Sequence, residues 1–154
     1  MRRVLLLGLM GLIGLFALIQ LVPYRIENPP VTGTPAWSSP EVEVLARRAC
    51  FDCHSHETAT PWYGWVAPIA WYVNDHVVEG REKLNFSAMD QPREDAHEAG
   101  EVVMEGEMPP AYYLRMHPEA RLTDAERDTL VAGLDLTLGG EGGRGGDSHE
   151  EDHD

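Results

Sequence analysis

The sequence predicts an all-α protein in which one small helical domain follows an N-terminal membrane-spanning helix. Residues 4–22 are apolar except for Gln20. Apolar side chains recur at helical spacing along residues 42–49 and 130–138. No segment alternates apolar and polar residues in the way that a half-buried strand does. The 154 residues are enough for one small domain with extensions.

The apolar N-terminal segment follows a positively charged start, Met1-Arg2-Arg3. At about 1.5 Å per helical residue it nearly spans a hydrocarbon core of ~30 Å. Arginines in front of such a helix stay in the cytoplasm, which places the rest of the chain outside. A cleaved signal peptide is the alternative, but its apolar region is usually shorter and ends at a small-x-small site, which Pro23-Tyr24-Arg25 does not offer. We therefore expect residues 1–23 to be an uncleaved signal anchor.

Residues 24–38 are rich in proline, with Pro29-Pro30, Pro35 and a turn at Gly33. This composition predicts an extended spacer that lifts the domain off the bilayer, with an irregular strand packed on the domain as the alternative. We expect the helical domain over residues 39–138. Residues 139–154 are rich in glycine and acidic residues and contain no apolar ones, which predicts a disordered tail.

The first helix of the domain begins at Ser39-Pro40-Glu41, where a capping hydroxyl precedes a proline and an acidic residue. Its apolar stripe consists of Val42, Leu45, Ala46 and Ala49. A second helix is predicted from residue 66 or 69 to about residue 84. A third, more polar helix is predicted between residues 92 and 107.

The last part of the domain is predicted to be a loop followed by a helix. Residues 112–118 follow a break at Met108-Pro109-Pro110 and are expected to form the loop. Thr123-Asp124-Ala125-Glu126 is a capping box, which starts a final helix that ends at Gly139-Gly140. The apolar side of this helix consists of Leu130, Val131, Leu134 and Leu138.

Both cysteines of the chain lie in one motif, Cys50-Phe51-Asp52-Cys53-His54. C-x-x-C-H is the pattern of covalent c-type haem attachment. Two thiols one helical turn apart can each add to a vinyl group on one edge of the porphyrin, and the next residue presents an imidazole to the iron. A surface disulfide or redox dithiol, and half of a metal site, are the alternatives; a four-cysteine zinc site is excluded by the cysteine count. Export favours haem, because bacteria attach it on the outer side of the inner membrane.

If haem is attached there, His54 is the proximal iron ligand, and the opposite ligand comes from farther along the chain. Met108 is our first choice, because flanking prolines stiffen its loop and a thioether suits low-spin iron of relatively high potential. Met104, one helical turn earlier, is an alternative. His76, on the apolar face of the second helix, is another and would give bis-histidine iron of lower potential. His56 lies too close to His54 to reach the opposite face easily.

Other side chains could surround such a cofactor. The aromatic residues between positions 61 and 65 could form either a cavity wall or ordinary core. Haem propionates need cationic or hydrogen-bonding partners, and the available cations are Arg81, Lys83, Arg115 and Arg121. His117, which precedes a proline, is expected to be solvated.

Further stretches accompany the haem motif: His76-Val77-Val78-Glu79-Gly80-Arg81, Leu84-Asn85-Phe86-Ser87, Gly106-Glu107-Met108-Pro109, His117-Pro118-Glu119-Ala120 and Leu122-Thr123-Asp124-Ala125-Glu126. With them the chain resembles the small bacterial haem-binding domain family, a relative of class I cytochrome c, over roughly residues 38–138. Met89 stands where that family often has tryptophan, which adds a thioether to the possible ligands. The resemblance implies a largely helical, cytochrome c-like, periplasm-facing domain around one covalent haem c. It implies no particular substrate.

These features favour a membrane-tethered, monohaem c-type cytochrome that transfers single electrons, anchored by one helix in the bacterial inner membrane. The alternatives are a module for gas or redox sensing with a weak or absent distal ligand, or an accessory subunit of a larger redox enzyme. No nucleophile–base pair in the sequence indicates an independent enzyme. The net charge of −14 argues against nucleic-acid binding and favours exported redox partners with a basic docking patch.

Overall fold

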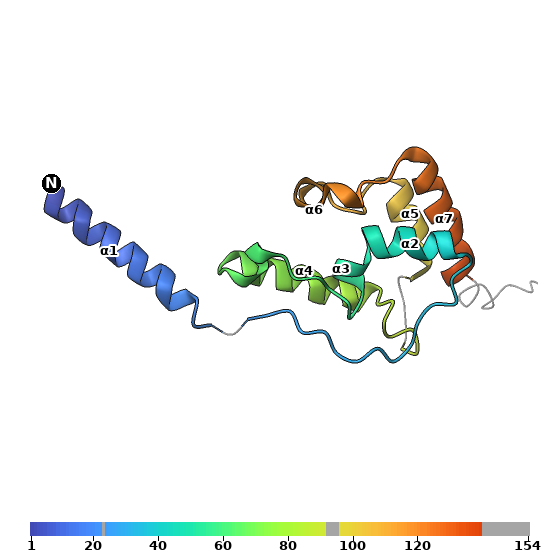
Figure 1. Cartoon of the computed structure of the whole chain (residues 1–154), viewed down its shortest axis with the longest axis horizontal. Helices are drawn as coiled ribbons and strands as arrows, with labels where there is room; N and C mark the ends of the chain where they lie inside the picture. Colours follow the sequence, from blue (N-terminus) through green and yellow to red (C-terminus); the bar gives the residue numbers. More distant parts are fainter. Residues whose placement is uncertain (23, 92–95, 140–154) are drawn as a thin grey trace, which may run out of the picture.

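The computed structural model describes residues 1–22, 24–91 and 96–139, and it folds into helices, with a long extended segment between the first two (Figure 1). The α-helices are α1 (Arg2–Ile19), α2 (Pro40–Ala49), α3 (Phe51–His54), α4 (Ile69–Lys83), α5 (Ala99–Met104), α6 (Ala111–Met116) and α7 (Asp124–Leu138). Short 3₁₀ turns lie at η1 (Trp62–Trp65), η2 (Ala96–Glu98) and η3 (Pro118–Ala120). Over these ranges no β-strand is formed, although one isolated bridge joins Gly33 to Ala88. The predicted all-α fold class is confirmed.

Helix α1 stands at one end of the molecule, away from the packed helices (Figure 1). None of its 18 residues is buried, and its mean hydropathy is 2.0. By length and composition it is a helix that can cross a membrane.

Helix α2 begins where the capping signal predicts. The Val42 amide donates to the Ser39 hydroxyl at 3.2 Å, and Pro40 occupies the first helical position. Its four predicted apolar residues are all buried, and they face α7 and the core. The stripe that sequence spacing predicts is therefore the face that packs.

Helix α7 begins with the predicted capping box. The Glu126 amide donates to the Thr123 hydroxyl, and the Thr123 amide donates to the Glu126 carboxylate at 2.8 Å. The Glu126 carboxylate also lies 2.8 Å from the Arg48 guanidinium of α2, so the same side chain joins the two helices.

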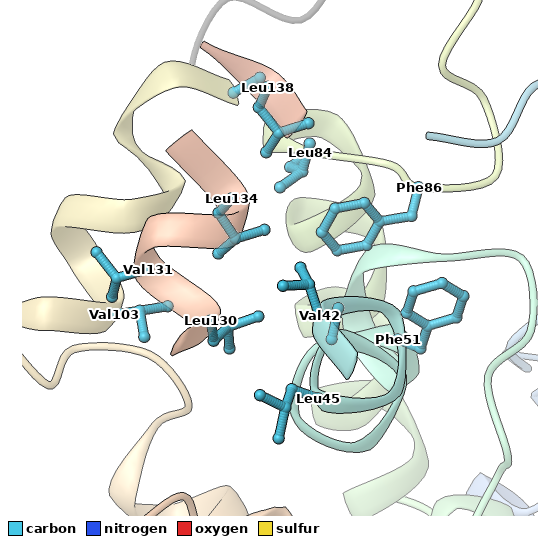
Figure 2. Close-up of a cluster of buried hydrophobic side chains, with 12 residues drawn as sticks. Val42, Leu45, Phe51, Leu84, Phe86, Val103, Leu130, Val131, Leu134 and Leu138 are labelled. Atoms are coloured by element: carbon cyan, nitrogen blue, oxygen red, sulfur yellow. The ribbon is translucent and has the colours of Figure 1, made fainter. Parts of the chain in front are cut away.

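The core lies between α2, α5 and α7 and extends to Phe51 and Phe86, whose rings stack 5.4 Å apart (Figure 2). Its buried members are Val42, Leu45, Ala46, Phe51, Leu84, Phe86, Ala96, Val103, Leu130, Val131, Leu134 and Leu138. Gly133 allows α7 to approach α2 closely, because a Cβ there would lie 2.1 Å from Cγ2 of Val42. The core thus fixes α2, whose C-terminal end leads into the cysteine motif.

Residues 24–38 are extended, but they lie against the domain. The Asn28 side chain donates to the Thr58 carbonyl at 3.0 Å, and the Thr32 amide donates to the Ser87 carbonyl at 2.9 Å. The centroid of the Trp37 ring lies 5.2 Å from that of the Phe86 ring. The alternative expectation, an irregular segment packed on the domain, therefore describes this part of the chain, because an extended backbone still offers amides and an apolar ring to its neighbours.

The third helix is found within the predicted range, since η2 and α5 together run from residue 96 to 104; residues 92–95 lie outside the described ranges. One predicted element differs from the structure. The loop predicted at 112–118 is wrong, because residues 111–116 form α6. Pro110 directly precedes that helix, at a position where a proline costs no helical hydrogen bond. The predicted tail lies outside the described residues from position 140 onward.

Candidate haem site

The cysteine motif forms a tight turn at the end of α2. Cys50 caps α2, and its carbonyl accepts hydrogen bonds from the amides of Cys53 at 3.2 Å and His54 at 2.9 Å. These bonds define the short helix α3 and set the two thiols one helical turn apart. This is the spacing that attachment to two vinyl groups of one porphyrin requires.

Helix α4 packs directly against the motif at Gly80. A Cβ on Gly80 would lie 2.7 Å from the carbonyl oxygen of Cys53, which is closer than atoms of this kind approach. Only glycine allows this contact. The motif is therefore held by two helices: α2, which continues directly into it, and α4, which packs against it.

His54 is oriented by the segment that follows α4. Its Nδ1 lies 3.0 Å from the Leu84 carbonyl oxygen, and its own carbonyl accepts from the Phe86 amide at 2.8 Å. Because a carbonyl only accepts, Nδ1 carries the proton and Nε2 is left with its lone pair. This is how metal-binding histidines are commonly fixed, with one nitrogen on a backbone carbonyl and the other toward the metal.

Burial lowers the pKa of His54, against the opposite effect of its contacts with the backbone of Leu84 and Gly80. The imidazole is therefore neutral at neutral pH. A neutral imidazole is the form that binds a metal.

The two thiols have raised pKa values. Burial raises the pKa of Cys50 to about 12, with a smaller effect from Cys53. Burial and then Asp52 raise the pKa of Cys53 to about 11, although Arg81 opposes the shift. Reactive dithiols depend on lowered thiol pKa values. The surroundings of both cysteines therefore do not activate the thiols as those of reactive dithiols do.

The motif lies between two cavities. The smaller one, of about 190 Å³, is lined by Cys50, His54 and Met108 together with apolar residues of α5 and α7. The larger one, of about 370 Å³, is lined by Cys53 and His76. Its size falls in the range of about 300–1,000 Å³ that is usual for small-molecule sites.

The candidate distal ligands differ in which cavity they line. Met108 is 37% exposed and lines the cavity that also contains His54. Met104 is 53% exposed and is among the lining residues of neither cavity. His76 lines the larger cavity, and its Nδ1 lies 2.9 Å from the Tyr72 carbonyl of its own helix. Met89 packs against the hydrophobic core. Of the two methionines that the sequence offers near the Pro-Pro break, Met108 is thus the one that shares a cavity with His54.

The aromatic residues between positions 61 and 65 are not core. Trp62 and Tyr63 line the larger cavity, and Trp62 and Trp65 are largely exposed. The phenol oxygen of Tyr63 lies 2.7 Å from Nε2 of His117, whose other nitrogen lies 3.2 Å from the Glu119 carboxylate. The expectation that His117 is solvated is wrong, because α6 brings it back over the cavity.

A hydrogen bond links α6 to the haem motif. The Tyr113 hydroxyl donates to the Asp52 carboxylate at 2.8 Å, and the Tyr113 ring stacks on His117 with centroids 4.3 Å apart. Burial and the nearby Asp52 raise the pKa of Tyr113. No local pattern in the sequence connects Tyr113, His117 and Asp52, because their contacts depend on the unpredicted helix α6.

The predicted cations have different surroundings. Arg81 donates to the carbonyls of Ser55 and Glu27 at 2.7 Å each, so it holds residues 24–38 against the motif. Arg121 donates to the Leu114 carbonyl at 3.4 Å, and Arg115 is exposed. Lys83 lines the smaller cavity beside His54. Of the four, Lys83 is therefore the cation best placed toward a group bound there.

These residues fit a haem. Both cavities meet the cysteine motif. The one that His54 and Met108 share has mostly apolar walls, and the larger one adds aromatic side chains, as a flat porphyrin requires. A pair of thiols and a neutral, pre-oriented imidazole are the donor set that covalent attachment and iron binding need.

Comparison with known proteins agrees with this chemistry. A family model described as "Haem-binding domain" matches residues 14–135, which is most of the chain. No curated protein and no solved structure matches the chain. The chain therefore belongs to the haem-binding domain family.

Proposed function

We propose that this protein is a monohaem c-type cytochrome that transfers single electrons on the periplasmic face of a bacterial inner membrane. One haem would be attached through Cys50 and Cys53, and His54 and Met108 would hold its iron. The protein acts as a carrier and has no catalytic activity of its own. Its partners are exported redox proteins.

The observation that carries the proposal is the placement of His54 and Met108 on one cavity, with Nδ1 of His54 on the Leu84 carbonyl. A bound haem iron would supply one-electron oxidation and reduction. The chain's own residues would hold such an iron with fixed ligands: the Leu84 carbonyl orients the His54 imidazole, and Pro109-Pro110 restrict the loop that carries the Met108 thioether. A fixed ligand pair favours a carrier, because little then rearranges between the two oxidation states.

The membrane tether is supported by α1. The helix is apolar, unburied and preceded by arginines at positions 2 and 3, and such a helix anchors with its charged end in the cytoplasm. The haem domain then lies outside the cytoplasm, where covalent haem attachment takes place.

The visible spectrum of the purified protein tests the carrier function against the sensing alternative. We expect sharp α and β bands in the reduced protein that carbon monoxide leaves unchanged, and a weak band near ~695 nm in the oxidised protein, which is typical of thioether-ligated haem iron. Rapid carbon monoxide binding would instead indicate a weak or absent distal ligand and a gas-binding module.

A further inference from the structure

The end of the domain nearest α1 has an exposed aromatic surface. Residues 58–74 contain no Asp, Glu, Lys, Arg or His, in a chain of which 25% of the residues are charged, and they contain three of the four tryptophans. Trp62 is 76% exposed and Trp65 is 56% exposed. Ile69 and Tyr72, at the start of α4, are also exposed.

Helix α6 extends this surface. Tyr112 lies with its ring centroid 6.0 Å from that of Tyr72, and both Tyr112 and Met116 are exposed. Figure 1 shows α6 and the N-terminal end of α4 at the side of the domain toward α1. We call the set Trp62, Trp65, Ile69, Tyr72, Tyr112 and Met116 the apolar face.

The exit of α1 is fastened to the same surface. Gln20, which caps α1, donates to the Ala67 carbonyl at 3.1 Å and accepts from the Ala67 amide at 2.9 Å. The Arg25 guanidinium lies over the Trp65 ring, 5.4 Å from its centroid. Two independent contacts thus hold the apolar face beside the point where the anchor leaves the membrane.

We propose that the apolar face lies in the headgroup layer of the membrane that α1 crosses, so that the domain rests on the bilayer. This inference rests on the proposed role of α1 as an anchor. Tryptophan and tyrosine are the side chains that collect at membrane interfaces, where an apolar ring and a polar edge are both satisfied. The surface continues the anchor directly, and residues 58–74, which supply four of its six members, contain none of the carboxylates that oppose approach to a membrane elsewhere on this acidic chain.

Docking has a consequence for the haem site. All members of the apolar face except Trp65 also line the larger cavity. A docked domain therefore turns one wall of that cavity toward the bilayer and leaves the α7 side toward the periplasm.

Photolabelling from the lipid tests this arrangement on the full-length holoprotein in nanodiscs. The lipid is phosphatidylcholine with a small fraction of a phosphatidylcholine that carries a diazirine in its headgroup region, and labelled residues are located by mass spectrometry. Leu136 on α7 provides the reference, because it is 76% exposed, as Trp62 is. We expect labelling of residues 62–72 and 111–116 to exceed that of residues 132–138 at least about tenfold, a ratio that corresponds to about 1.4 kcal/mol.

A double variant and a matched control sharpen the test. W62S/W65S removes the two exposed rings and should reduce the labelling of residues 111–116, which it does not alter, to the level of residues 132–138. Leu136→Ser, a change at equal exposure on α7, should leave the labelling pattern unchanged.

The outcomes separate the docking from the anchor. Equal labelling of both sides of the domain, with residues 1–22 intact by mass, overturns docking and leaves the anchor standing. If the protein is a dimer and lipid does not label its apolar face, the face binds a second copy of the chain. This result also overturns docking. A purified protein cut after the apolar segment overturns the anchor, and the docking with it.

Discussion

At the scale of single residues, the site depends on how His54 is oriented. Its position in the motif comes from the local sequence, but its ring is fixed by Leu84, which lies 30 residues away. The imidazole is neutral because burial lowers its pKa, and the bond to the Leu84 carbonyl leaves Nε2 available. The motif contains the proposed ligand, and the tertiary fold orients its imidazole.

Met108→Ala should remove the distal ligand. We expect the variant to lose the band near ~695 nm and to bind carbon monoxide when reduced, because the open position on the iron becomes accessible. The measurement is absorption spectroscopy of the oxidised and reduced holoprotein.

Met104→Ala is the matched control, since it deletes an exposed thioether of α5 four residues earlier. It should leave the spectrum unchanged. If His76→Ala alone disturbs the low-spin spectrum, the methionine assignment is wrong and the iron has two histidine ligands.

The sequence predicts the part of the site that is local. Cys50, Cys53 and His54 lie within five residues, and Met108 is singled out by its neighbouring prolines. The pairing of Tyr63 with His117 spans 54 residues and depends on α6. No local sequence pattern predicts such a contact.

At the scale of elements, the haem motif depends on the contact between α3 and α4. The helices meet where Gly80 lies against the backbone of Cys53. The neighbouring Arg81 donates to Ser55 and Glu27, so one turn of α4 organises the motif and the preceding extended segment.

Gly80→Ala should lower the stability of the holoprotein by about 1–3 kcal/mol, because the added methyl group overlaps a backbone oxygen that cannot move alone. Alanine would favour an isolated helix by up to about 1 kcal/mol, and the overlap outweighs this gain. Urea unfolding monitored by far-ultraviolet circular dichroism measures the difference.

Glu79→Ala, at an exposed position on the same helix, serves as the control and should change the stability little. A Gly80→Ala protein as stable as the wild type would show that α4 does not pack on the motif as described.

Glu126, at the start of α7, makes the stability of the fold depend on pH. The hydrogen bond from the Thr123 backbone, followed by Arg48, lowers the pKa of Glu126 in the folded protein. Stability from this carboxylate is therefore complete above the pKa of an unfolded glutamate, about 4.3, and is lost as the pH falls through the lower folded value. Glu126→Gln should flatten this part of the curve, as measured by urea unfolding between about pH 6 and pH 3.

Asp128→Asn, an exposed carboxylate on the same helix, should keep the acid sensitivity of the wild type. An unchanged pH profile in Glu126→Gln would contradict the role of the capping box and its contact with Arg48.

Elements with local signals were predictable, and those formed by tertiary contact were not. The starts of α2 and α7 follow from capping residues and apolar spacing that lie within each helix. Helix α6 buries no residue completely and follows two prolines, so neither periodicity nor composition marks it. The packing of residues 24–38 depends on partners such as Thr58 and Ser87, which the segment itself does not reveal.

At the scale of the whole molecule, the net charge of the protein influences how fast it associates with redox partners. The chain has 26 acidic and 12 basic residues, and its net charge is −14. Such a field attracts cationic partners over about one Debye length, ~8–10 Å at physiological salt, and it weakens as salt rises.

Small redox reagents of opposite charge can measure this field without a partner protein. Electron exchange with a cationic hexaammineruthenium complex should slow as ionic strength rises from about 0.01 M to 0.15 M, and exchange with ferricyanide should become faster. Stopped-flow absorption of the haem gives both rates. The reverse pair of trends would mean that a local positive region, such as that around Lys83, controls access to the haem.

The central claim is that one haem is covalently bound through Cys50 and Cys53. Its most direct test is the mass of the full-length protein, made in a host that attaches c-type haem and measured under denaturing conditions after acid–acetone extraction. We predict the mass of the chain plus one haem, and the mass of the bare chain for the double variant Cys50→Ser/Cys53→Ser. If acid–acetone extracts the haem from the wild-type protein and the measured mass is that of the chain alone, the account is contradicted.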